Sequence, residues 1–586
     1  MSRRIVHRGP SAPLRVAART ALLGWLLGSI ACGGGGEEGP VLPVCEGVIP
    51  VPDAQLRALL QAILTDPEAS DDTGTGTIGA GASSGDSGSA GGDPGIDAEA
   101  LASITGLQAA GRDIVDLRGL ECARGLVTLG LANNKIESLA PLATLSGLRE
   151  IELSGNPLTK LGALASLTAL EKLVLAGTGV GDLKFVTPLA GLRHLDLAGN
   201  KVRDLAPLAA HANLESLVLT SNQIADAAPL AGLTVLFALE LDDNQLTSVA
   251  PLAGLTKLEY LDLDKNQLTS LEPLAGLVHL RDLEASNNLL TDTAGLADKP
   301  DLVELALENN DLVSLAGLTG LGGVTTVDLD GNQLKRLDGL ERLVSLRTLS
   351  ARGNQLTDIG ALAELGDVRS LDLRENPKLL ALGPLAGLGL LDYLAAGGNQ
   401  LDQDLGPLTG LPLLRSLDLS ETGTADYSPL SSLPALRTLA LHGARLDAAA
   451  VDDLGKLIAL TSLDISDTAV ADITPLAPLV DLTALDASNT AVPSLAPALA
   501  WTRVEELVFA GSKVADITGV DALKNLATLD LAGTKVADLA AIAANTYFRR
   551  GDRVDVTGAP VDLGDCPAIV ELRSRDAVVI TDLDCK

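Results

Sequence analysis

Aromatic residues are scarce in this chain. Phe, Trp and Tyr together make up 2% of the 586 residues, whereas hydrophobic residues make up 46%. A buried core must therefore consist of Leu, Ala and Val, which suits a thin repeated core better than the interior of a globular enzyme.

Positive charge is also in short supply. The chain has 43 Lys and Arg against 76 Asp and Glu, a net charge of −33. This excess of negative charge argues against nucleic acids and anionic lipid surfaces as partners. A basic protein or peptide remains a candidate partner, and so do divalent cations.

Motifs for catalysis and metal binding are missing as well. The sequence contains no nucleophile elbow, P-loop, HExxH motif or paired CxxC motif. Four histidines lie outside the N-terminal segment, none at ligand spacing on one strand, and each is expected at the solvated surface: His194, His211, His279 and His442. We therefore expect no enzymatic activity, no cofactor and no metal ligands.

What the chain does have is a repeat of 22 residues. Asn fills eleven of twelve slots at this spacing, and Thr178 fills the other. The Asn slots are Asn134, Asn156, Asn200, Asn222, Asn244, Asn266, Asn288, Asn310, Asn332, Asn354 and Asn376. Less regular copies follow, with slots at Asn399, Thr422, Ala444, Thr468, Thr490, Ser512 and Thr534. A fixed period over twelve copies, followed by seven less regular ones, predicts a solenoid, because no single copy can bury its own leucines.

Each copy also predicts its own local structure. Leu261-Asp262-Leu263 alternates apolar and polar residues, which indicates a short strand with one buried face. Asn266 follows where the chain turns inward, and its amide can serve the backbone groups of neighbouring turns. Pro273 opens a return segment, which we expect to be a 3₁₀ turn. Strands of successive copies should form a parallel sheet on the concave side.

The consensus LxxLxLxxNxLxxLxPLAxL resembles the 22-residue leucine-rich repeats of the internalin type. The resemblance implies an α/β solenoid, a leucine-rich repeat horseshoe. Its sheet would be concave and parallel, its convex side would carry 3₁₀ or short helical segments, and helical caps would close both ends. The expected domains are an N-terminal cap over 45–105 with a disordered Gly- and Ser-rich loop at 70–95, a repeat array over 106–546, and a C-terminal cap over 547–586.

Besides Cys32, four cysteines lie at the two ends of the chain and none in the regular array. In an exported chain this placement predicts one disulfide in each cap, Cys45–Cys122 and Cys566–Cys585. Metal binding is the competing use, but the pairs lack close CxxC spacing and no histidine accompanies them.

The first residues are typical of a targeting segment. Residues 1–31 carry five Arg and then an apolar run over 21–31 that is too short to span a bilayer. Cys32 and a glycine run follow, which resembles a bacterial lipoprotein signal with Cys32 as the lipidated residue and 32–44 as a flexible tether. An ordinary secretory signal, cleaved nearby, is the alternative. Removing residues 1–31 leaves 38 basic against 76 acidic residues.

The array is expected to change character after Asn399. Thr, Ala or Ser fills the slot there, and a hydroxyl offers one donor against two for an amide, so the inner row of hydrogen bonds should be thinner. The longest copy, at residues 447–457, is expected to carry a helical turn, and the curvature is expected to change between 399 and 468.

Acidic residues recur at the central outward position of the strand, four residues before the slot. Eleven of nineteen copies carry one: Glu152, Asp196, Glu240, Asp262, Glu284, Asp328, Asp372, Asp418, Asp464, Asp486 and Asp530. Leu-Asp-Leu is ordinary consensus in such repeats and can be scaffold alone. Further acids stand nearby, however, and we treat Glu240, Asp262, Glu284 and Asp328 as consecutive central positions. The predicted ligand-binding patch, called the acidic patch below, is Glu240, Asp242, Tyr260, Asp262, Asp264, Asp282, Glu284, Glu304, Glu308, Asp328 and Asp330.

Two functions fit these observations. The first is an exported, lipid-anchored module that binds a protein or peptide, basic in character, on an acidic concave face. The second is a structural scaffold of the cell envelope without a dedicated ligand. Both place the chain in a bacterial cell envelope, periplasmic or surface-exposed, with membrane contact through the lipid anchor only.

Overall fold

The computed structural model describes residues 45–65, 95–401, 404–424 and 426–585. The expected signal peptide, the lipidated Cys32, the tether and the loop over 70–94 lie outside these residues. Within the described ranges, no helix is both long and apolar enough to cross a membrane.

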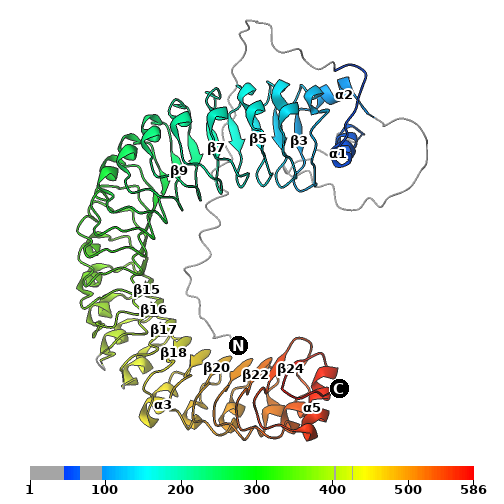
Figure 1. Ribbon diagram of the computed structural model, residues 1–586. Coiled ribbons are helices and arrows are strands. Elements are labelled where there is room, and N and C mark those ends of the chain that lie inside the picture. Colours follow the sequence, from blue (N-terminus) through cyan, green and yellow to red (C-terminus); the bar gives the residue numbers. More distant parts are fainter. Residues whose placement is uncertain (1–44, 66–94, 402–403, 425, 586) are drawn as a thin grey trace. The chain divides into compact units, whose positions relative to one another are not determined.

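One parallel sheet runs the length of the unit Cys45–Lys586, with its strands in chain order along the inner side of a curved array (Figure 1). Strand β3 pairs with β4 and β24 with β23, and the two ends of the sheet lie apart. The strands are β3 Gly106–Gln108, β4 Thr128–Gly130, β5 Glu150–Glu152, β6 Lys172–Val174, β7 His194–Asp196, β8 Ser216–Val218, β9 Ala238–Glu240, β10 Tyr260–Asp262, β11 Asp282–Glu284, β12 Glu304–Ala306, β13 Thr326–Asp328, β14 Thr348–Ser350, β15 Ser370–Asp372, β16 Tyr393–Ala395, β17 Ser416–Asp418, β18 Thr438–Ala440, β19 Ser462–Asp464, β20 Ala484–Asp486, β21 Glu506–Val508, β22 Thr528–Asp530, β23 Arg553–Asp555 and β24 Val578–Ile580.

Each strand buries its middle residue and turns its two outer residues to the concave side. Leu261 is fully buried and stands in register with Leu239 and Leu283 on the neighbouring strands. The return segment of this copy is the 3₁₀ helix η10, Glu272–Gly276, with Pro273 in its first turn. The horseshoe expected from the sequence is confirmed, and the concave face therefore presents columns of residues spaced one repeat apart.

The Asn slot ties two neighbouring turns of the solenoid together. The Asn266 amide donates to the carbonyls of Leu241, 2.9 Å away, and Leu263, 3.1 Å away. Its side-chain oxygen accepts from the backbone amide of Leu246 at 2.9 Å. The buried amide thus satisfies backbone groups of its own copy and of the copy before, as the sequence predicted.

The Asn row becomes thinner in the later copies, as predicted. The Thr422 hydroxyl donates within its own copy to Leu419, at 2.7 Å, and the Thr468 hydroxyl does the same to Ile465 at 2.6 Å. The expected helical turn is α3, Ala448–Leu454, with Asp447 as its N-cap. The change of curvature between 399 and 468 stays a prediction.

On the convex side, most copies have a buried leucine at the position of Leu277. Four copies have a polar or amphipathic residue at this position instead. Each replacement is buried and contacts the carbonyl 25 residues earlier. The pairs are His211 with Val186, Lys299 with Leu274, Trp501 with Leu476, and Asn545 with Val520. Burial lowers the pKa of Lys299. The expectation that His211 is a solvated surface residue is therefore wrong.

The N-terminal end is closed by short elements. Strand β1, Val48–Ile49, pairs antiparallel with β2, Ile96–Asp97, and helices α1, Ala54–Thr65, and α2, Ala98–Ser103, follow them in the chain. The Cys45–Cys122 disulfide joins this segment to the first copies.

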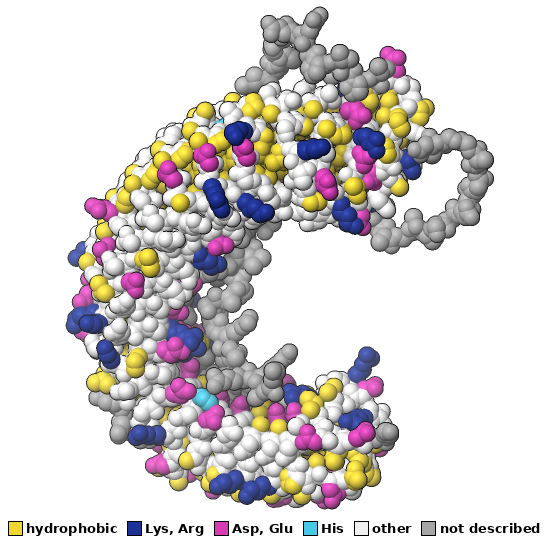
Figure 2. Space-filling model, in the orientation of Figure 1, with side chains coloured by type: hydrophobic (Ala, Val, Ile, Leu, Met, Phe, Trp, Pro, Cys, Tyr) yellow, Lys and Arg dark blue, Asp and Glu magenta, His cyan; other side chains and the backbone are white. Residues whose placement is uncertain are grey.

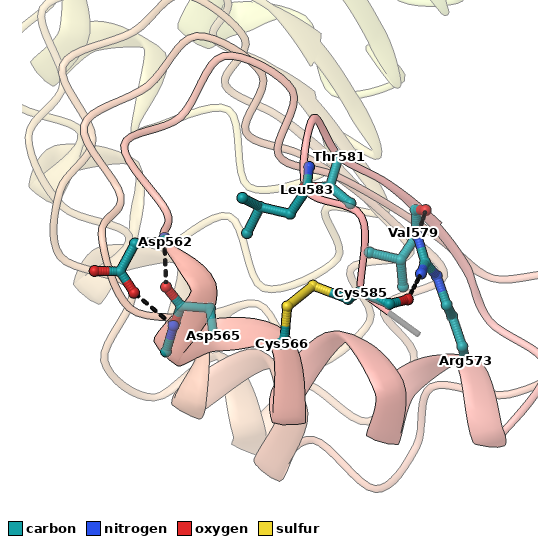
Figure 3. The surroundings of a disulfide bond; sticks show 9 residues. Asp562, Asp565, Cys566, Arg573, Val579, Thr581, Leu583 and Cys585 are labelled. Carbon is teal, nitrogen blue, oxygen red and sulfur yellow. Dashed lines mark hydrogen bonds between the residues drawn. A yellow bond between two sulfur atoms is a disulfide. The ribbon is translucent and has the colours of Figure 1, made fainter.

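The C-terminal end carries helices α4, Ala540–Ala544, and α5, Cys566–Ser574. Cys566 is bonded to Cys585, and the Arg573 guanidinium donates to the Cys585 carbonyl at 2.9 Å (Figure 3). Asp562 and Asp565 form a capping box just before α5. Both predicted disulfide pairings are confirmed, whereas the exact cap and array boundaries stay predictions.

Candidate functional site

The candidate site is the concave face around strands β9 to β13. Three columns of outward residues cross it, which we name from β10: the first column contains Tyr260, the central column Asp262 and the second column Asp264. In register, Asp262 lies between Glu240 and Glu284. Ala306 separates Glu284 from Asp328, so the expectation of four consecutive central acids is wrong. The run has three, with neighbouring strands about 4.8 Å apart.

The central acids have a structural task that the sequence did not show. Nine of the eleven accept a hydrogen bond from the backbone amide two residues ahead: Glu152, Asp196, Asp262, Asp328, Asp372, Asp418, Asp464, Asp486 and Asp530. The bond lies where each strand ends and the chain turns. An acid in the central column is therefore explained in part by the scaffold.

The second column distinguishes the acidic patch from the rest of the array. It holds Asp242, Asp264, Glu308 and Asp330 in four of five adjacent copies, with Ser286 as the fifth. Earlier copies carry Ala, Ser or Thr there, and the next two carry Arg352 and Arg374, so the acids are confined to this part of the array. Leu-Asp-Leu consensus does not account for this cluster.

Burial is deepest at β10. Asp262 is 2% exposed and Asp264 is 8% exposed, whereas Glu284 is half-buried and Glu304 is exposed. Asp262 accepts from the Asp264 amide at 3.0 Å, and Asp264 accepts from the Ser286 amide at 2.6 Å. One carboxylate oxygen from each of Asp262, Asp264 and Glu284 can be chosen so that all three lie within 4.8 Å of one another.

Electrostatics in this cluster favour the neutral form of Asp262. Burial is the main cause that raises the pKa of Asp262 to about 8. The carboxylates of Asp242, Glu284 and Asp264 also raise this pKa, whereas the hydrogen bond from the Asp264 amide lowers it. Burial and the neighbouring Glu284 also raise the pKa of Tyr260, whose hydroxyl lies 3.4 Å from a Glu284 oxygen.

A second cluster lies at β13. Burial and Asp330 raise the pKa of Asp328 to about 8, and burial also raises the pKa of Asp330. Two donors from the next copy serve Asp330, the Ser350 hydroxyl at 2.5 Å and the Arg352 amide at 2.7 Å. The carboxylate of Asp330 is therefore engaged by neutral groups of the scaffold.

The patch ends where cations enter the columns. Arg374 forms an ion pair with Asp372, with an Nε–Oδ1 distance of 3.0 Å, and Arg352 forms an ion pair with Glu375. At the other end, the Thr220 hydroxyl donates to Asp242 and to Glu240. No Lys or Arg stands in the central column of the nineteen copies, whereas these two arginines stand in the second column.

Charges of both signs mix elsewhere on the surface. Exposed ion pairs join Arg149 to Glu171 and Arg193 to Glu215, and Figure 2 shows blue and magenta side chains interspersed over the visible face. A depression of about 450 Å³ has both signs in its wall, including Arg193, Glu215 and Lys257 around Phe237. It shares no residue with the acidic patch.

Two remaining histidines depart from the expectation of a solvated residue to different extents. His194 is half-buried and burial lowers its pKa. His442 contacts the Ser466 hydroxyl at 2.9 Å and lies 3.3 Å from Asp467. His279 is exposed as expected, 3.3 Å from Asp301.

The comparisons with known proteins agree with this geometry. A family model described as Leucine Rich repeats (2 copies) matches residues 234–276. The solved structure of the plant peptide hormone receptor RGFR1 in complex with RGF2 is 19% identical, with a TM-score of 0.53 over 79% of this chain and 88% of that chain. The match to residues 234–276 and the shared fold show that this chain has a leucine-rich repeat fold.

Two Listeria monocytogenes structures are also similar. The internalin InlF is 24% identical, with a TM-score of 0.41, and the match covers 74% of this chain and 95% of that chain. The functional domain of InlJ is 22% identical, with a TM-score of 0.48, and the match covers 68% and 76%. Among curated proteins, no sequence matches this chain significantly.

Proposed function

We propose that this chain is an exported binding module that holds a basic segment of a protein or peptide against the acidic patch. The observation that carries the proposal is the second column, where Asp242, Asp264, Glu308 and Asp330 stand together although the repeat does not require them. Carboxylates crowded at strand spacing repel one another, and a cationic ligand would relieve that repulsion. The RGFR1 structure, with RGF2 bound, gives a precedent for ligand binding on this fold.

Export and lipid anchoring are part of the proposal. The two disulfides support an oxidising compartment, since such bonds are rare in a reducing cytosol. The basic stretch, short apolar run and Cys32 in the sequence support a lipidated N-terminus on a bacterial envelope.

The test is direct binding of labelled peptides to the purified protein, with a chelator present so that no divalent cation contributes. A Lys- and Arg-rich peptide should bind with an affinity that falls steeply as salt rises, because the attraction is largely screened. An acidic peptide of the same length is the control. Equal binding of the two peptides, or binding insensitive to salt, would contradict the proposal.

A structural envelope scaffold is the second candidate, and the hydrogen bonds of the nine central acids favour it. In that case, the acids only shape the turns and keep copies of the chain apart. Sedimentation of the protein alone tests this candidate: ordered self-association without a partner, combined with no binding of basic peptides, would support the scaffold.

A further inference from the structure

The acidic patch contains a group of oxygens with the dimensions of a cation site. Oxygens from Asp262, Asp264 and Glu284 lie within 4.8 Å of one another. Ca²⁺ binds carboxylate and hydroxyl oxygens at about 2.3–2.6 Å, so two ligands on opposite sides of one ion stand about 5 Å apart. The spacing of the three carboxylates therefore lets one ion contact all of them.

A buried serine beside the carboxylates is the second, independent observation. Ser286 is 0% exposed, and its hydroxyl has no hydrogen-bond partner among the described residues. Such a group costs free energy unless something binds it. Ser286 occupies the second column one repeat after Asp264. Side chains alternate between the two faces of an extended segment, and Ala285 faces the core, so the side chains of Glu284 and Ser286 both face the concave side. The hydroxyl is therefore placed to act as a fourth oxygen.

The matching segment at β13 does not share this arrangement. Asp328-Leu329-Asp330 repeats the Asp262-Leu263-Asp264 sequence. There, however, Arg352 stands in the position of Ser286. Its amide donates to Asp330 as the Ser286 amide donates to Asp264, but the Ser350 hydroxyl also donates to the same Asp330 oxygen. The position equivalent to Glu284 relative to Asp262 is held by Ser350 at β14. The identical local sequence thus gives a natural control inside the same chain.

We propose that Asp262, Asp264 and Glu284, with the Ser286 hydroxyl, bind one divalent cation of the calcium class. All the ligands are hard oxygens, as calcium prefers, and none is a nitrogen or sulfur that would favour zinc. These ligands form no metal-binding motif in the sequence, because the group comes from two repeats. The cation would offset the mutual repulsion of the carboxylates, whether or not a peptide ligand exists.

The experiment is calorimetric titration of the purified full-length chain, freed of metal by a chelator and dialysed, with CaCl₂ and separately with MgCl₂ at constant ionic strength. One equivalent of Ca²⁺ should bind saturably, with the dissociation constant in or below the millimolar range typical of extracellular sites. Asp264→Asn and Glu284→Gln should each weaken binding at least tenfold. Asp330→Asn, the matched control, should leave the affinity unchanged.

Three results would overturn the proposal: no saturable Ca²⁺ binding up to 10 mM, roughly ten times the weakest typical site; equal loss in Asp330→Asn; or Mg²⁺ binding tighter than Ca²⁺. Circular dichroism of each variant checks that the fold is intact. A thermal melt gives the second readout, since a ligand that binds only the folded chain must raise the wild-type melting temperature. Peptide binding is measured separately, in the presence of a chelator. A failure to bind Ca²⁺ would therefore leave the proposed peptide binding untouched, and a failure to bind peptide would leave the proposed cation site untouched.

Discussion

The carboxylate of Asp264 accepts a hydrogen bond from the backbone amide of Ser286, 2.6 Å away and one repeat further along the chain. This contact links β10 to β11 on the concave side and fixes one oxygen of the acidic patch in place. The repeat period alone would place the Asp264 side chain in solvent. In the structure, this side chain is 8% exposed and accepts the hydrogen bond from Ser286.

The first prediction concerns pH and Asp262. Its pKa is raised to about 8 in the folded chain, against about 3.9 when unfolded. The folded state therefore holds the proton more tightly, so this carboxyl contributes stability at low pH that is lost as the pH rises from about 4 to about 8. The groups that face it are Asp242, Asp264 and Glu284.

Asp262→Asn keeps the oxygen that accepts from the Asp264 amide but cannot ionise. In chelator, the variant should match wild type near about pH 4 and exceed it increasingly towards about pH 8. The gap should grow by at most about 1.4 kcal/mol for each pH unit. Denaturant midpoints at several pH values check this, and a gap that does not change with pH would show that Asp262 is ionised throughout.

The second prediction compares two slots of the inner row. Asn266 makes contacts to its own copy and to the previous one, whereas Thr468 makes a local contact. Asn266→Ala should cost about 2–4 kcal/mol, because several buried backbone groups lose their partner, and Thr468→Ala about 1 kcal/mol. Chemical unfolding of the two variants gives the comparison. Equal losses would contradict the idea that the Asn row links repeats.

The repeat period made most of the fold predictable from sequence. Asn266 and Pro273 recur in enough copies that their burial and their turn follow from the pattern. The exceptions could not be read in the same way. Lys299 and His211 are polar residues at a position where most copies have leucine. Only the fold shows that each side chain forms a hydrogen bond with a backbone carbonyl of the previous repeat.

The candidate site was predictable in part. The positions of its acidic residues follow from the repeat columns in the sequence. Which of these acids accept hydrogen bonds from the turns, and which are buried, could not be predicted. The amide bond to Asp262 lies within one copy, yet the burial of Asp264 and the unpartnered Ser286 hydroxyl depend on packing between copies. Sequence position gives the column of a residue, whereas exposure and partners come from its neighbours across the sheet.

The third prediction concerns the C-terminal disulfide. Cys566→Ser should free Cys585 for alkylation and lower the melting temperature, because the cross-link restrains the end of the array by about 2–4 kcal/mol. Cys45→Ser is the corresponding variant at the other end. Peptide mapping without reductant supplies the check, and free thiols in the native protein would contradict the stapling of the ends.

The fourth prediction concerns the anchor. Mass spectrometry of the mature N-terminus should find a lipid-modified Cys32, which follows the short apolar run and precedes the glycine run. Cys32→Ser should release the protein from membranes while leaving its melting temperature unchanged. Cleavage elsewhere with an unmodified Cys32 would instead indicate an ordinary secretory signal.

The most direct test of the acidic patch as a binding surface compares two charge-neutralised variants. At about pH 9, above the pKa of about 8 that burial gives Asp262, Asp262→Asn with Glu284→Gln removes two adjacent charges from the patch. At the same pH, Asp464→Asn with Asp486→Asn removes two charges from the same column on β19 and β20. Binding of the basic peptide in chelator at low salt is the measurement. We expect the first pair to weaken binding at least tenfold and the second to leave it within twofold, whereas equal affinities for both variants and wild type would contradict recognition at this face.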